Sequence, residues 1–218
     1  MNSLRPKTRK VGTPATMKQR AYTDILNRIL DGRYSPGHLL NRRGVAQELR
    51  MSSAPVHEAM IELECAGFVE ALPRLGTRVR HARVEDLRGH LIVREALECQ
   101  AARMICGEPV VSRLETLRPL AHPADCIELP YSERARHEVD FHIALVELAN
   151  CPALLREYRR VMQIGLFYRI NLLMPMQAGE PINSHVSLLE ELASSTPDAA
   201  ADAVRRHVWS GKSDALKA

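Results

Sequence analysis

The sequence predicts a mainly α-helical protein of two domains: a small N-terminal domain of three helices and a β-hairpin, and a larger C-terminal helical bundle. Three observations support this. Aromatic residues make up only 4% of the 218 residues, which disfavours β-sandwiches and barrels. Apolar residues recur at helical spacing along most of the chain. Two short strand-like runs with a turn signal between them fall between residues 68 and 81.

The first 81 residues are predicted to form an arm and a compact domain. Residues 1–15 contain prolines, a glycine and charges without periodicity, which is typical of a disordered arm. The domain spans residues 16–81 and begins at Thr16, a candidate helix N-cap. After two helices, Ser52 or Ser53 can cap a third. The runs 68–72 and 77–81 then form a hairpin, and three helices followed by a hairpin are the layout of a winged helix-turn-helix.

From Val84 onward the pattern is helical only. Residues 84–218 are therefore predicted to form an all-α bundle, with the domain boundary near residues 80–84. The expected helices lie near 84–107, 109–121, 130–150, 152–174, 181–194 and 197–215, separated by prolines that include Pro123.

Charge and composition narrow the classes of function. Residues 1–81 hold 14 basic against 7 acidic residues, and residues 82–218 hold 16 against 19, so a basic domain is joined to a mildly acidic one. This asymmetry suits an N-terminal domain that meets a polyanion. Five cysteines without CxxC spacing indicate reduced thiols of a cytoplasmic protein. No apolar run approaches the ~18 residues of a membrane span, and the basic N-terminus does not resemble a secretory signal.

The segment from Arg43 to Val79 resembles the GntR superfamily of bacterial regulators. The resemblance rests on Arg43, Val45-Ala46, Leu49, Pro55-Val56, Glu58-Ala59, Leu63, Gly67-Phe68-Val69 and Gly76-Thr77-Arg78-Val79. It implies binding to double-stranded DNA, and the predicted contact residues are Arg43, Ser52, Ser53, Ala54 and His57, with Arg74, Gly76 and Arg78 in the wing. Ser53 and His57 replace family arginines, and Arg50 replaces the turn glycine, so a known operator sequence cannot be transferred.

Three histidines and a carboxylate form a candidate metal site. Glu138 and His142 are four residues apart and share one helix face, while His185 and His207 lie on two later predicted helices. Brought together in a bundle core, this quartet could bind Zn²⁺, Ni²⁺ or Mn²⁺. The alternative is that each histidine is an ordinary core or surface residue.

Residues 87–210 resemble the effector-binding FCD domain of the FadR subfamily. Its landmarks stand here as Arg94 to Glu98, Glu138 to Leu145, Asn150 to Leu154, Ser184-His185 and Arg206-His207. The resemblance implies that Glu138, at the position of the family's aspartate, binds metal with His142, His185 and His207. It also implies that Arg94 binds a small organic acid, and Tyr168 and Arg169 are further candidates for this pocket. A structural salt bridge between Arg94 and Glu98 is the alternative.

These features together predict a ligand-responsive transcription regulator, a repressor that binds an inverted repeat as a homodimer and is not an enzyme. Two alternatives belong to other classes. A metal-dependent hydrolase could use three histidines and a carboxylate to activate water, but the quartet has no separate general base and the basic domain is then unexplained. A protein-interaction module would show no salt-dependent affinity for DNA.

Overall fold

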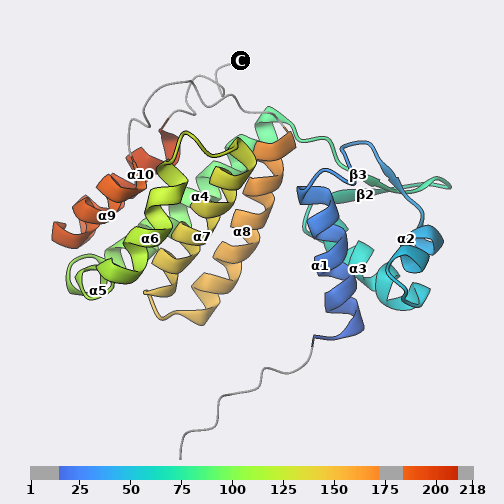
Figure 1. The fold of residues 1–218 in the computed structure, drawn as a ribbon, viewed down its shortest axis with the longest axis horizontal. Coiled ribbons are helices and arrows are strands. Elements are labelled where there is room, and N and C mark those ends of the chain that lie inside the picture. The colour runs from blue at the N-terminus through green and yellow to red at the C-terminus, as the bar shows by residue number, and fades with distance from the viewer. Residues whose placement is uncertain (1–14, 172–183, 211–218) are drawn as a thin grey trace, which may run out of the picture.

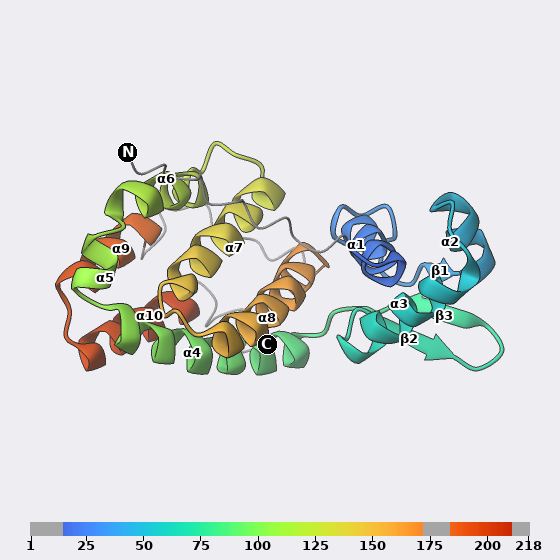
Figure 2. The same cartoon turned by 90° about the horizontal axis from the view of Figure 1, so that it is seen from below.

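A computed structural model describes residues 15–171 and 184–210, which form two bodies lying side by side (Figure 1 and Figure 2). We call them the head, residues 16–79, and the body, residues 84–209. The head contains α1 (Met17–Leu30), β1 (Leu39–Leu40), α2 (Arg42–Glu48), α3 (Ser53–Cys65), β2 (Val69–Leu72) and β3 (Gly76–Val79). The arm predicted over residues 1–15 lies outside the described residues except for Ala15.

Local sequence signals explain where the helices of the head begin. Thr16 caps α1 as predicted: its hydroxyl accepts from the Gln19 N–H, and the Gln19 side chain accepts from the Thr16 N–H. Asn41 caps α2 with its side chain alone: its Oδ1 accepts from the Arg43 and Gly44 N–H groups. Arg50, in the turn before α3, has a φ of 53°, the left-handed conformation for which the family uses glycine, at a cost of about 1 kcal/mol.

The wing is a three-stranded antiparallel sheet with strand order β1-β3-β2. The predicted hairpin is confirmed, with Val69 opposite Val79 and Leu72 opposite Gly76. Gly76 has a φ of 107°, a conformation that favours glycine. Strand β1 was not predicted, because two residues are too few to show an alternating pattern.

The body contains α4 (Val84–Ile105), α5 (Glu108–Val111), α6 (Leu114–Asp125), α7 (Tyr131–Glu147), α8 (Pro152–Asn171), α9 (His185–Ser194) and α10 (Pro197–Trp209). The described body is all-helical, as predicted, with two differences in detail. The segment predicted as one helix over 109–121 is split into α5 and α6. The interpretation of Pro123 as a terminator was also wrong, because α6 continues through it to Asp125. Packing of α6 against α7 and α9 outweighs the backbone hydrogen bond that proline removes.

The head contacts the body through α8 and the start of α4. The rings of Phe68 and Phe167 meet edge to face with centroids 5.6 Å apart, and both side chains are buried. The guanidinium of Arg80 lies 3.5 Å from the carboxylate of Asp86. In Figures 1 and 2 the helix α8 is the part of the body next to α1. No helix in the described part of the chain is long and apolar enough to cross a membrane.

Candidate functional site

The body brings together three histidines from three helices. His142 of α7, His185 of α9 and His207 of α10 are all buried, and one ring nitrogen of each lies within 4.8 Å of the others. The Nε2 atoms of His142 and His207 are 3.2 Å apart. Two imidazoles bound to one tetrahedral metal at 2.0–2.1 Å would have their nitrogens roughly 3.3 Å apart. The His142–His207 pair therefore has the spacing of two ligands of one metal ion, and His185 offers a third nitrogen within 4.8 Å.

A carboxylate orients His185 through its Nδ1 atom, on the side of the ring away from Nε2. Asp125, the last residue of α6, lies 2.6 Å from His185 Nδ1 and also accepts from the backbone N–H groups of His185 and Val186. Burial raises the pKa of Asp125, but these hydrogen bonds outweigh it and the pKa is lowered. Nδ1 then donates to a carboxylate, which leaves the lone pair on Nε2, and Nε2 has no hydrogen-bond partner among the described residues. Such a buried nitrogen is suited to a metal.

A second buried carboxylate faces His142. Glu98 Oε2 is 3.3 Å from His142 Nδ1, and Glu98 Oε1 accepts from Arg94 Nε at 2.6 Å and from the Tyr158 hydroxyl. Although burial raises the pKa of Glu98, Arg94 and His142 hold it well below its usual value. Burial lowers the pKa of His142 to about 4 despite the opposing effect of Glu98. His142 is therefore neutral near pH 7, the protonation state of a metal ligand.

Arg94 is the charged centre of this network. Its side chain is buried, with Nε on Glu98 and Nη1 at 3.1 Å from Glu138 Oε1. The structural salt bridge to Glu98 is thus formed, but Nη2 is also buried and has no partner in the described part of the chain. Glu138 lies one turn before His142 on α7, and in this structure its carboxylate faces Arg94 rather than joining the three histidines.

The other two pocket candidates are placed differently. Tyr168 is buried at the junction with the head, where its ring meets His90 edge to face. Burial, and to a smaller extent the negative charge of Asp86, raises the pKa of the Tyr168 hydroxyl. It lies ten residues beyond Tyr158 on α8, or about 15 Å along the helix from the residue that touches Glu98. The side chain of Arg169 lies outside what the structure describes. Sequence reasoning missed Tyr158 and Asp125, neither of which belongs to a local motif.

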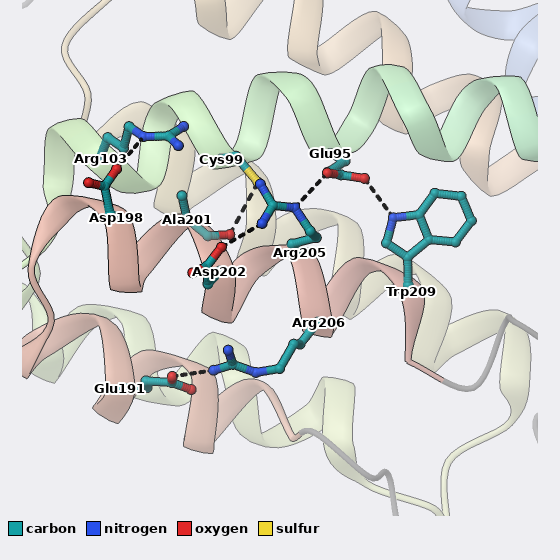
Figure 3. A network of polar contacts seen from close by, with 10 residues as sticks. All are labelled: Glu95, Cys99, Arg103, Glu191, Asp198, Ala201, Asp202, Arg205, Arg206 and Trp209. Atoms are coloured by element: carbon teal, nitrogen blue, oxygen red, sulfur yellow. Dashed lines mark hydrogen bonds and ion pairs between the residues drawn. The ribbon is translucent and has the colours of Figure 1, made fainter.

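A seam of polar contacts holds α10, and with it His207, against α4 (Figure 3). Glu95 accepts from Arg205 Nε at 2.9 Å and from Trp209 Nε1 at 2.7 Å. Further along the seam, the Cys99 thiol donates to the Ala201 carbonyl and Arg103 meets Asp198. Since Arg94 and Glu98 lie on α4 and His207 lies on α10, this seam fixes the two halves of the site relative to each other.

The predicted DNA-contact residues lie on α2, on the first turns of α3 and on the wing. Arg43, Ser52, Ser53, Ala54, Arg74 and Gly76 are exposed, whereas His57 and Arg78 are partly buried. Ser52 is the N-cap residue of α3 but its side chain makes no capping hydrogen bond, so its hydroxyl is not committed to the helix. Arg78 pairs across the hairpin with Glu70 at 2.8 Å. That pair competes with any phosphate for the guanidinium.

Sequence comparison matches both domains to known families. The FCD domain matches residues 91–209, more than half of the chain, and the family of bacterial regulatory proteins named gntR matches residues 17–79. One relative is a Paenarthrobacter nicotinovorans protein named "Probable D-xylose utilization operon transcriptional repressor". It is 27% identical over 212 residues, covering 92% of this chain and 89% of the relative.

Two solved structures share the fold. A GntR transcriptional regulator from Rhodococcus sp. RHA1 has a TM-score of 0.70 at 21% identity, covering 93% of this chain and 97% of that one. McbR/YncC of E. coli has a TM-score of 0.64 at 18% identity, covering 89% and 94%. At these identities the likeness supports the winged head and helical body alone. The two family matches show that the chain belongs to the gntR family of bacterial regulatory proteins, with an FCD domain as its C-terminal part.

Proposed function

We propose that the protein is a cytoplasmic transcriptional repressor that binds an inverted DNA repeat as a homodimer and changes its DNA affinity when a small organic acid binds in the body. The observation that carries the proposal is the buried connection from the three-histidine cluster through Glu98 to Arg94. Such a site would place a metal ion close to a permanently charged guanidinium, so a carboxylate effector could coordinate the metal and form an ion pair with Arg94. A relative named as an operon repressor supports the direction of regulation.

His142, His185 and His207 would hold Zn²⁺, Ni²⁺ or Mn²⁺. Glu138, one turn before His142, would be the fourth ligand once its carboxylate exchanges Arg94 Nη1 for the metal. The metal would supply a Lewis-acidic position for one oxygen of the effector. The chain's own groups do the rest. Asp125 and Glu98 orient two of the imidazoles, and Nη2 of Arg94, which has no partner among the described residues, is available to the acid.

The experiment that tests this function combines DNA binding with a panel of acids. Duplexes selected from a random pool are bound by the purified protein, and short mono-, di- and hydroxycarboxylates are titrated into the complex with Zn²⁺ present. At least one acid is expected to shift the Kd for the selected duplex about fivefold or more, the usual range of allosteric coupling. A protein that selects no sequence, or whose DNA affinity no acid changes, would contradict the proposal.

Arg43→Ala is expected to weaken binding to the selected duplex by about 1–3 kcal/mol and to reduce discrimination between sequences, because an exposed arginine at the start of α2 can reach a base or a phosphate. The measurement is fluorescence anisotropy at several salt concentrations. Arg33→Ala is the matched control, since Arg33 is an exposed head arginine that pairs with Asp31. Equal losses in the two variants would contradict a specific role for Arg43.

The junction between head and body is the expected route of coupling. Asp86 pairs with Arg80 just beyond the wing, and α4 continues from Asp86 to Arg94. Asp86→Asn is expected to reduce the effect of the acid on DNA affinity about threefold or more without changing affinity for the acid itself. Asp31→Asn, which breaks an ion pair within the head, is the control and should leave the coupling intact. Unchanged coupling in Asp86→Asn would exclude this contact from the route.

A further inference from the structure

One face of α4 has no partner in the described chain. The helix packs against α5, α7, α8 and α10 on its other side. The exposed face comprises Glu85, Arg88, Gly89, Ile92, Val93, Ala96, Gln100, Arg103 and Met104. Three of these are large apolar side chains, with Ile92 at 54%, Val93 at 49% and Met104 at 46% exposure. Single exposed apolar residues are ordinary, but several on one helix face indicate a contact surface.

Small residues mark the centre of this face. Gly89 and Ala96 are seven residues apart, two turns of helix, and therefore lie one above the other. Gly89 costs the helix about 1 kcal/mol relative to alanine, and a Cβ atom added there would meet nothing within 4 Å. Nothing in the part of its own chain that the structure describes thus requires a glycine at this position. A second helix packed closely against α4 would, because small residues let two helix backbones approach.

We propose that this face of α4 is the interface of the homodimer, with the α4 helices of two copies packed antiparallel about a two-fold axis. The inference rests on the dimer of the proposed function and names its surface. When Ile92 is placed opposite Ala96 of the partner subunit, the same register places Glu85 opposite Arg103 of the partner subunit. Two-fold symmetry repeats both contacts. Within its own chain Arg103 donates from Nε to Asp198 at 3.3 Å, a long contact with an exposed carboxylate. The guanidinium can therefore also pair with Glu85 of the partner subunit.

The length of α4 supports the antiparallel arrangement. Its 22 residues span about 33 Å, and the head is attached at its N-terminal end. Antiparallel packing therefore attaches the two heads at opposite ends, roughly 33 Å apart, close to the ~34–36 Å between half-sites one DNA turn apart. Parallel packing would attach both heads at the same end. The charges at the ends of the face and the spacing of the heads thus favour a second copy as the occupant.

The test is the mass of the full-length protein in solution, measured by sedimentation equilibrium. Wild type is expected at twice the 24.5 kDa chain mass. Ala96→Glu, which places two carboxylates within the interface, is expected to be monomeric at the same concentration with an unchanged circular dichroism spectrum. Ala153→Glu is the matched control, an exposed alanine in the first turn of α8, and should remain dimeric.

A charge exchange tests the register and does not depend on how Ala96→Glu folds. Glu85→Arg and Arg103→Glu alone are each expected to weaken the dimer about threefold or more, and the double variant is expected to restore it. A dimeric wild type whose mass is unaffected by Ala96→Glu, or whose charge variants show no rescue, would overturn this interface while the dimer itself stands. A monomeric wild type that still binds the inverted repeat would overturn both the interface and the homodimer.

Discussion

His142→Ala is expected to remove the bound metal and with it the stabilisation that metal gives to the folded body. The side chain is fully buried between His185 and His207, so its loss removes one of the four proposed ligands and should weaken metal binding strongly. Metal bound only by the folded state at a hundredfold excess over its Kd stabilises by about 2.7 kcal/mol. For a chain of this size that corresponds to roughly 5–10 °C in Tm.

Two measurements check this prediction. Elemental analysis should find one metal ion per chain in wild type and much less in His142→Ala, and a chelator should lower the Tm of wild type but not that of His142→Ala. Trp209, the one tryptophan of the chain, lies two residues after His207 and donates to Glu95, so its fluorescence should respond to added Zn²⁺ in wild type. His137→Ala is the matched control on the same helix. Equal, negligible metal in all three proteins would contradict the metal site.

The carboxylate behind His185 should give a graded result. Asp125→Asn keeps the shape of the side chain but removes its charge, and His185 Nδ1 then donates to a weaker acceptor. Metal affinity is expected to fall about 10–100-fold, less than for removal of a ligand. An unchanged affinity would show that Asp125 only holds the end of α6 against α9.

Local signals in the sequence predicted much of the fold and part of the site. The N-cap Thr16 and the hairpin around Gly76 could be predicted because a cap or a turn depends on a few adjacent residues. The three histidines could be placed on three predicted helices, and their grouping into one site rested on the resemblance to the FCD domain. Nothing local pointed to Asp125, which lies 60 residues before its partner His185.

The surroundings of Arg94 show why the remaining contacts of the site could not be predicted from the sequence. Glu98 was a visible i, i+4 partner, but the approach of Glu138 and of Tyr158 depends on how α4, α7 and α8 pack. Long-range packing also decided the extent of α6, where local proline signals predicted an earlier end. In both places tertiary contacts set the outcome.

Arg94→Lys is expected to abolish most of the response of DNA binding to the acid while leaving DNA binding without acid nearly unchanged. Lysine retains a cation for Glu98 but loses the planar fork, including the Nη2 group that is buried without a partner in the described chain. A tenfold or larger loss of acid affinity is expected, since a lysine ammonium paired with Glu98 has no second arm that reaches the acid as Nη2 does. Arg118→Lys, at an exposed position of α6, is the matched control.

Arg94→Ala is expected to behave differently from Arg94→Lys. Removing the guanidinium leaves Glu98 buried without its cation, which costs about 3–5 kcal/mol of folding free energy, so the alanine variant should lose stability as well as response. Acid affinity measured by calorimetry, DNA affinity with and without acid, and thermal unfolding separate the two effects. If Arg94→Lys responds to the acid as wild type does, Arg94 serves the Glu98 network alone. The acid must then bind through other groups, because an effector acts only through its differential affinity for the two states of the protein.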